Sequence, residues 1–272
     1  MKARLKGHFT PEQLRRYLVS EALIFWGLIL LCRLLYPAEN RFSIMTHTFS
    51  FLGSFDAKHN PRFWFLFTIA LVFWGLFTVP LVLFLHRRLR GSSPWAVWPG
   101  TLLLLEGCLG MVLVGIFPDA HGKVVGDLMH THVHQDVALM AFAGYGLGIP
   151  WMGALLLKDQ IRWIPWGGRR LFQWRKSIFP FAFYIVIFSI ALYFQLKWEV
   201  VYSEMKANAQ ATGAKIGSHW SEALNTVYSF PLWENVLIYT MYTFMAWFPL
   251  TLLEENREAL SQDQIEKEST SL

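Results

Sequence analysis

Histidines gather in the polar segments between the apolar runs of this chain of 272 residues. Seven of the nine lie in three such segments: His47, His59, His121, His130, His132, His134 and His219. An imidazole changes its charge near neutral pH, so it can act as a general base or acid, and its neutral form binds metal ions. One histidine in a loop is usually an ordinary polar residue, but this concentration indicates where chemistry is to be expected.

The third segment runs from Phe117 to Asp136, and its residues 130–134 read His-Thr-His-Val-His. In a helix, His130 and His134 would share one face; in an extended chain, all three histidines would point the same way. Either geometry fits a zinc site that leaves a position for a nucleophilic water, with the candidate ligands His121, His130, His134 and Asp136. The alternative is a hydrated polar turn with Asp136 at the favourable start of a helix, and no His-Glu-x-x-His motif is present.

A second candidate group lies in the first segment, where residues 46–53 read Thr-His-Thr-Phe-Ser-Phe-Leu-Gly. A serine hydroxyl becomes a nucleophile when a base accepts its proton. Ser50 could therefore act with a histidine near it in the sequence, such as His47, and Asp119 and His134 of the third segment are the other candidate catalytic residues. Because no Gly-x-Ser-x-Gly motif surrounds Ser50, the alternative is that it shapes a tight turn with Gly53.

Two ionisable residues are noted within the apolar runs, Glu106 and Arg33. Charges in lipid are expensive and usually face a bundle interior or a polar cavity, so both are functional candidates. Arg33 lies near the end of its run and could extend to the interface. Glu106 is central, which predicts a hydrogen bond to a neighbouring helix or a role in handling protons.

The elements that must position these residues are membrane spans. The chain is 54% hydrophobic and 16% charged, with a mean hydropathy of +0.34, whereas soluble domains carry about 25% charged residues. Six apolar runs are long enough to cross a bilayer as helices, and none alternates as a strand would. The predicted fold is a single all-α transmembrane domain over residues 1–272, a bundle with spans at about 17–36, 63–85, 96–117, 137–157, 178–196 and 233–253.

Lys and Arg are unevenly divided between the two sets of connections. Sixteen lie in the two tails and the second and fourth connections, and seven lie in the other three. Because cytoplasmic loops hold the positive excess, both termini are predicted to be cytoplasmic in a multi-pass protein of the plasma membrane. The basic residues flank apolar runs and form no stripe, so a membrane lipid is the expected partner and a nucleic acid is not. Cys32 and Cys108 lie inside runs and are expected to be core residues.

Short motifs in these segments resemble a family of polytopic membrane proteins known as domain of unknown function 998. The matching residues are Ser50, Leu52 and Gly53, then Phe117, Pro118 and Asp119, then His130, His134 and Ala138. The resemblance covers about residues 17–157, and the remainder matches as a hydrophobic pattern. The family is distantly similar to eukaryotic membrane proteins that remodel lipid anchors, which implies lipid chemistry by analogy of fold.

The leading hypothesis is an integral membrane enzyme that hydrolyses or transfers an acyl group on a lipid at the outer leaflet. Its site would bring together His47, Ser50, Asp119, His121, His130, His134 and Asp136, with a histidine as base or with zinc-bound water. The alternatives are a proton- or metal-coupled transporter or channel that uses Glu106, a haem protein, and a binding protein without catalysis. Histidines in outer segments weigh against haem, whose ligands are expected on facing helices.

Overall fold

The computed structural model describes residues 2–56, 59–60, 62–91, 93–119, 133–166, 174–212, 224 and 226–270. Over these residues the chain is helical and contains no strand. The helices are α1 (Lys2–Leu5), α2 (Pro11–Leu34), α3 (Trp64–Leu89), α4 (Val97–Ile116), α5 (Val133–Trp166), α6 (Trp174–Thr212) and α8 (Phe230–Thr270), with short 3₁₀ helices η1 (Ala38–Asn40) and η2 (Phe49–Gly53) between α2 and α3.

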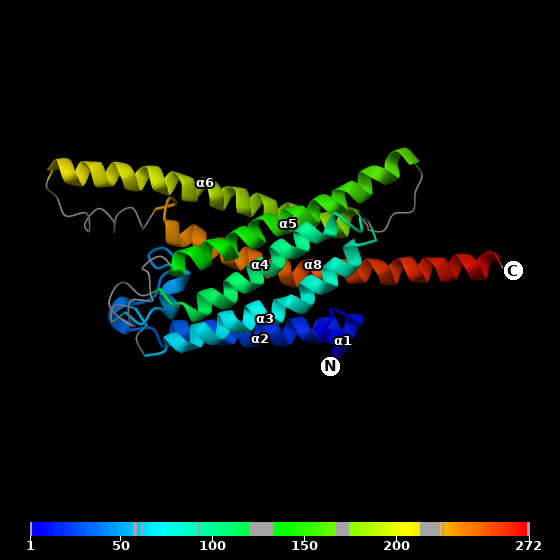
Figure 1. Ribbon diagram of the computed structural model, residues 1–272, viewed down its shortest axis with the longest axis horizontal. Coiled ribbons are helices and arrows are strands. Elements are labelled where there is room, and N and C mark those ends of the chain that lie inside the picture. The colour runs from blue at the N-terminus through cyan, green and yellow to red at the C-terminus, as the bar shows by residue number, and fades with distance from the viewer. Residues whose placement is uncertain are drawn as a thin grey trace.

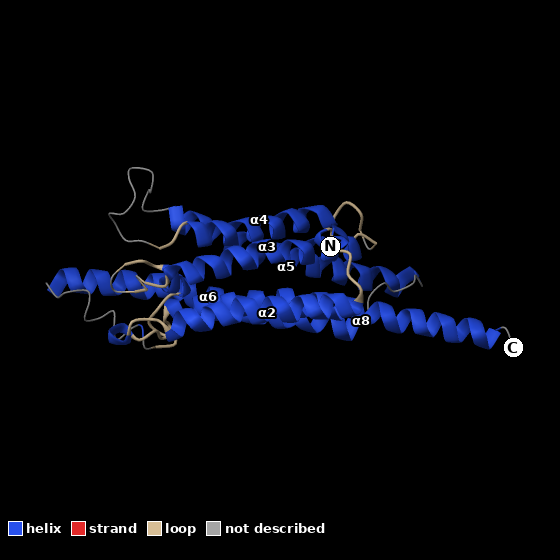
Figure 2. Cartoon of the chain, turned by 90° about the horizontal axis from the view of Figure 1, so that it is seen from below, coloured by secondary structure: helices blue, strands red, loops and turns tan. Residues whose placement is uncertain are grey.

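The long helices lie side by side along the longest axis of the molecule (Figure 1). Helices α3, α4 and α5 form one layer, and α2, α6 and α8 form the other (Figure 2). The most extensive contacts join α4 to α5 and to α3, and α6 to α8, while α2 packs on α3 across the layers. The amino and carboxyl ends lie toward one end of the bundle, and η1 and η2 lie at the opposite end (Figure 1).

Apolar side chains cover the outside of the bundle as well as its core. On α2, Phe25 and Ile29 are buried, whereas Leu23, Leu30 and Leu34 are exposed. A helix that is apolar all round is stable where its outer face meets lipid. Five helical segments of the described chain are long and apolar enough to cross a membrane: Pro11–Leu34, Trp64–Leu89, Val97–Ile116, Val133–Lys158 and Ile178–Thr212. The chain is therefore a multi-pass integral membrane protein.

The helices match the six predicted runs in place but differ from them in length. Helix α2 begins six residues before the predicted start at residue 17, because Thr10 and Gln13 form a capping box and Pro11 occupies the first turn. Helices α5, α6 and α8 extend well beyond their apolar runs. The sixth run lies on α8, whose first turns carry Glu234 and Asn235.

Helices α4 and α5 approach closely because small residues line their contact. A methyl group added at Gly110 would lie 2.5 Å from the backbone nitrogen of Ala141, and one added at Gly144 would overlap the backbone of Gly107. Small residues let membrane helices pack backbone to backbone. This contact fixes the start of α5 beside the end of α4. Elsewhere in the core, Cys32 and Cys108 are buried free thiols, as their positions in the sequence predicted.

Candidate functional site

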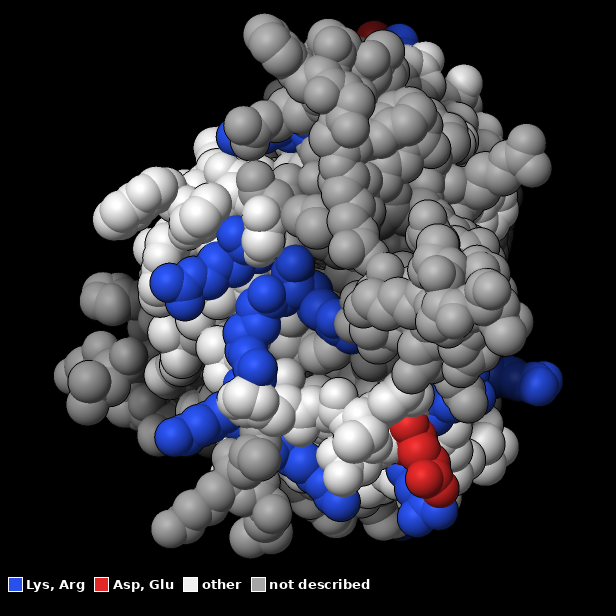
Figure 3. Space-filling view, turned by 90° about the vertical axis from the view of Figure 1, so that its right-hand side faces the viewer, with Lys and Arg blue, Asp and Glu red and all other residues white. Residues whose placement is uncertain are grey.

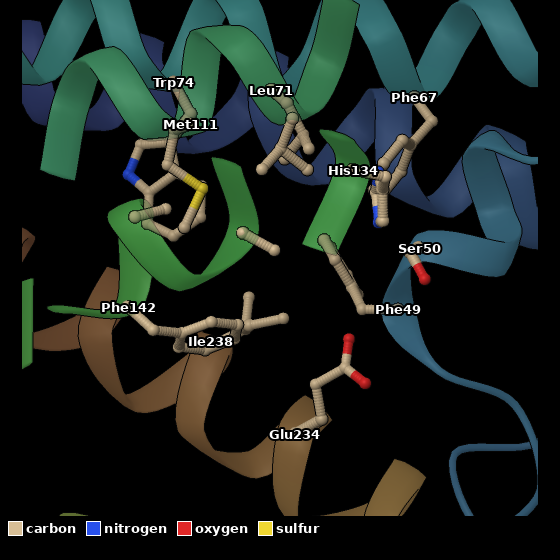
Figure 4. A pocket seen from close by; sticks show the side chains of 13 residues that line it. Phe49, Ser50, Phe67, Leu71, Trp74, Met111, His134, Phe142, Glu234 and Ile238 are labelled. Atoms are coloured by element: carbon tan, nitrogen blue, oxygen red, sulfur yellow. The ribbon is translucent and has the colours of Figure 1, made fainter. Parts of the chain in front are cut away.

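A small cavity lies inside the bundle beside η2, with walls from α3, α4, α5 and α8 (Figure 4). Its volume is about 30 Å³, enough for one or two water molecules. Apolar side chains make up most of its wall, and Ser50, His134 and Glu234 are its polar members. These three surround one end of the cavity, while Trp74 and Met111 lie at the other (Figure 4). The cavity therefore combines a reactive end with an apolar interior.

Ser50 is held on η2 by a directed chain of hydrogen bonds. Its hydroxyl donates to Asp119 Oδ2 at 3.2 Å, and the hydroxyls of Thr48 and Ser50 are 3.0 Å apart. Because the single proton of Ser50 goes to Asp119, Thr48 must be the donor to Ser50. Helix η2 itself packs on α3, where a side chain at Gly53 would overlap the ring of Phe67. Ser50 thus keeps one oxygen lone pair for a reacting group.

Asp119 follows the end of α4, two residues after its C-cap Phe117. The intervening Pro118 is buried and Asp119 is half-buried. A proline cannot donate a backbone hydrogen bond and restricts the residue before it to extended conformations, so it suits the point at which α4 ends. This turn brings the Asp119 carboxylate to Ser50, 69 residues earlier in the chain.

His134 lies in the first turn of α5, and its tautomer follows from one contact. Its Nδ1 is 2.7 Å from the backbone oxygen of Phe117. A carbonyl oxygen only accepts, so Nδ1 carries the proton and, in the neutral ring, Nε2 carries the lone pair. Such a nitrogen can accept a proton or bind a metal ion.

Glu234 completes the polar end of the cavity from α8. Its carboxyl group is buried, with the residue 8% exposed, and points toward the space between η2 and α5 (Figure 4). It accepts a hydrogen bond from the backbone amide of Phe49 and lies close enough to Asp119 to feel its charge. Glu234 therefore anchors the first residue of η2 and contributes a second carboxyl group to the site.

The chain was compared with known protein families, curated proteins and solved structures. The model of the family described as "Protein of unknown function (DUF998)" matches residues 22–250. The chain belongs to this family. No curated protein and no solved structure matches it. The matched range includes the four residues of the candidate site described above, Ser50, Asp119, His134 and Glu234.

His47 of this DUF998 protein lies apart from the cavity. It is 7% exposed, its Nε2 is 3.1 Å from Asn40 Oδ1, and its Nδ1 is 2.8 Å from Thr46 Oγ1. Burial, together with the charge of the nearby His59, lowers the pKa of His47 below its usual value. The backbone oxygen of His47 also accepts from Asn235 of α8 at 3.1 Å. These contacts make His47 a residue that shapes the loop before η2.

The candidate zinc ligands are only partly described. His121 and His130 lie outside the described residues, and Asp136 is exposed on α5 and does not line the cavity. Where side chains are described, no group of three His, Cys, Asp or Glu could hold a metal ion. His134 is thus the one predicted ligand that the described part of the chain places at the cavity.

Glu106 and Arg33, the two ionisable residues noted within the apolar runs, do not line the cavity. Glu106 is exposed on the outer surface of α4. Arg33 is half-buried at the end of α2, and its guanidinium carbon lies 5.2 Å from the ring centre of Phe42 and 5.5 Å from that of Tyr239. Aromatic faces stabilise a cation at such distances, so Arg33 packs the loop between η1 and η2, through Phe42, and helix α8, through Tyr239, onto the end of α2.

Sequence reasoning missed two buried carboxyl groups, Glu234 and Glu21. Glu21 is 4% exposed on α2 and accepts a hydrogen bond from Thr78 of α3 at 3.5 Å. Both glutamates lie inside predicted spans, at 17–36 and 233–253, but near the starts of those runs. The sequence signal that could have identified Glu21 and Glu234 is their position within predicted spans, because an ionisable residue within a span is a functional candidate by default.

Proposed function

We propose that this protein is a membrane-embedded enzyme that hydrolyses or transfers an acyl group of a lipid. One observation carries the proposal: Ser50, hydrogen-bonded to Asp119, and His134, whose Nδ1 donates to a carbonyl group, line the polar end of an otherwise apolar cavity. A nucleophile, a carboxylate and an imidazole base are the groups that acyl transfer needs. The apolar walls favour a lipid over a water-soluble substrate.

The hydrogen-bond directions suggest the order of proton transfers. Ser50 Oγ attacks the acyl carbonyl while its proton passes to Asp119, its acceptor in the resting site, and then to the leaving alcohol or amine. In hydrolysis, His134 Nε2 takes a proton from the attacking water and returns it to Ser50 as the acyl group leaves. In transfer, an acceptor alcohol replaces the water. A cavity of about 30 Å³ admits the carbonyl group and a water molecule, so the rest of the lipid stays in the bilayer.

The basic residues support an orientation for the site. With six spans, the two tails and the second and fourth connections carry most of the Lys and Arg and would face the cytoplasm. The cavity lies beside η2, at the end of the bundle away from the two termini, so in this orientation the reaction would take place at the outer leaflet of the plasma membrane. Both termini would then be cytoplasmic.

Zinc remains a proposed cofactor for which the described donors supply one ligand. The Nδ1 proton of His134 donates to a carbonyl group, as is usual for a metal-bound histidine, and bound zinc would supply an activated water. His121 and His130 would have to complete the site, so no step above passes through the metal. Elemental analysis of the purified protein and of the His130→Ala/His134→Ala variant tests this idea. Stoichiometric zinc that disappears in the variant is the expected result for a zinc enzyme.

A fluorophosphonate probe, which reacts covalently with activated serines, tests the function directly. We expect it to label the protein in membranes, and we expect Ser50→Ala to abolish labelling and to lower release of fatty acid from a phospholipid panel by roughly 10³-fold or more. His134→Gln should lower turnover by about 10²- to 10⁴-fold. Ser189→Ala is the control, because Ser189 is exposed on α6. Equal labelling of the wild type and Ser50→Ala would exclude Ser50 as the nucleophile.

A further inference from the structure

A second, larger pocket lies at the end of the molecule opposite the candidate site. It is formed by the turn between α1 and α2, the first turn of α2 and the last turns of α3. Its volume is about 500 Å³, within the range of small-molecule sites, about 300–1,000 Å³. The lining residues are Gly7, His8, Phe9, Thr10, Gln13, Phe84, Arg87 and Arg88.

The wall of this pocket depends on one close approach of the backbone. Gly7 has a φ of +73°, and a side chain there would lie 2.5 Å from the backbone nitrogen of Phe84. Glycine is the residue that tolerates both conditions. The neighbouring Phe9 packs edge-on against the ring of Phe84, with the ring centres 6.2 Å apart. The turn between α1 and α2 is therefore fixed against α3, and the pocket is a built feature of the fold.

The charge of this pocket is positive. Arg87 and Arg88 line it with His8, and none of its described lining residues is acidic. The Arg88 guanidinium carbon lies 5.5 Å from the ring centre of Phe84. The nearby carboxylate of Glu12 is bound at 2.6 Å by Arg16 on its own helix. Figure 3 shows basic side chains gathered over this end of the molecule.

Orientation in the membrane explains why this end is basic, and the carboxyl end of a helix favours cations. Neither membrane orientation nor the helix end explains why Arg87 and Arg88 line the same pocket. Where side chains are described, neither Arg87 nor Arg88 has a carboxylate partner within ion-pair distance. Two like charges in such a pocket repel each other, and a bound anion removes that repulsion. The side-chain oxygens of Thr10 and Gln13 accept hydrogen bonds from each other's backbone amides. Arg87 and Arg88 are therefore the lining groups that carry a permanent positive charge for an anion.

We propose that this pocket binds a phosphate group through Arg87 and Arg88. The planar guanidinium group matches a phosphate in bidentate geometry, and basic pockets between membrane helices on the cytoplasmic side suit anionic headgroups. The phosphate could belong to a phospholipid headgroup or to a soluble phosphate ester. This proposal does not depend on the acyl-transfer site, which lies at the other end of the bundle.

Binding to the full-length protein in a neutral detergent tests the proposal. The probes are short-chain phosphatidylglycerol, phosphatidylcholine of the same chain length, and inorganic phosphate, with affinity measured by the change in tryptophan fluorescence. We expect phosphatidylglycerol to bind and Arg88→Gln to weaken its binding on the order of tenfold. The Arg87→Gln/Arg88→Gln double variant should lose it. Arg90→Gln removes the same charge from the same helix end without lining the pocket and should bind as the wild type does.

Each outcome decides one part of the proposal. Binding of phosphatidylglycerol alone identifies a lipid headgroup as the source, and competition by inorganic phosphate at similar concentration identifies a soluble phosphate. Equal weakening by Arg90→Gln and Arg88→Gln would show a general charge effect and overturn the pocket. Equal affinity for phosphatidylcholine would show that the pocket recognises the phosphodiester that both lipids carry and not the rest of the headgroup. Phosphatidylglycerol binding that the Arg87→Gln/Arg88→Gln variant retains would overturn the pocket. Because thermal unfolding of each variant is measured without ligand, a folding defect is recognised separately.

Discussion

Ser50 and His134 each make a hydrogen bond whose direction is fixed by its partner. The Phe117 carbonyl can only accept a hydrogen bond, and so can the Asp119 carboxylate in its ionised form. The serine proton therefore points to Asp119, and the imidazole proton of His134 points to the Phe117 carbonyl. The sequence indicated these residues because of their types and because their segments join neighbouring helices, but it could not show which nitrogen of His134 is free.

Glu234 and Glu106 show the limit of the sequence at this scale. Both are glutamates in apolar runs, yet Glu234 is buried at the cavity and Glu106 is exposed on α4. An apolar helix has no polar face that would tell which side turns inward. The packing of six long helices decides this, and no single run contains that information.

His47 gives a prediction on pH. Its pKa is lowered in the folded protein, so the unfolded chain, with a histidine pKa of about 6.5, binds a proton more readily. Stability is then full above that pH and falls as the pH is lowered through it. We expect the thermal midpoint in detergent to drop between pH 7.5 and 5.5, and His47→Gln to reduce that drop by about 2–4 °C. The exposed His8→Gln variant should keep the full drop. A pH profile that His47→Gln leaves unchanged would contradict this assignment.

At the level of elements, the end of α2 and the boundaries of α3 and α4 follow from the sequence more closely than the ends of α5, α6 and α8. A capping box at Thr10 and Gln13 and the run that ends before Pro118 are local signals. The polar continuations of α5, α6 and α8 have no comparable signal. Apolar length predicts where a helix crosses lipid, and helix propensity alone lets it continue into water.

The α4–α5 contact gives a prediction at this scale. Gly110→Ala places a methyl group 2.5 Å from the Ala141 backbone, and forcing the helices apart should cost about 1–3 kcal/mol. Alanine favours a helix over glycine by about 1 kcal/mol, which leaves a net destabilisation of up to about 2 kcal/mol. Gly27→Ala is the matched control, because a methyl group there meets no atom within 4 Å, and it should be neutral or stabilising. Similar thermal midpoints for the two variants would contradict the close contact.

At the level of the whole molecule, the proposed topology can be tested with cysteines. Glu39 and Arg90 are exposed at opposite ends of the bundle, and the natural Cys32 and Cys108 are buried. A membrane-impermeant maleimide added to intact cells should label the Glu39→Cys variant and leave Arg90→Cys unlabelled until the membrane is opened. The reverse pattern would move the candidate site to the cytoplasmic side.

The contacts between the first connection and α8 affect when the site forms during synthesis. Ser229 donates a hydrogen bond to the backbone oxygen of Met45, and Asn235 donates one to the backbone oxygen of His47. Glu234 accepts a hydrogen bond from the backbone amide of Phe49. These partners lie about 185 residues later in the chain than the loop that they hold. The ribosome releases the loop long before α8 exists. In a nascent chain, the candidate site would thus stay incomplete until α8 has been made and has packed against this loop.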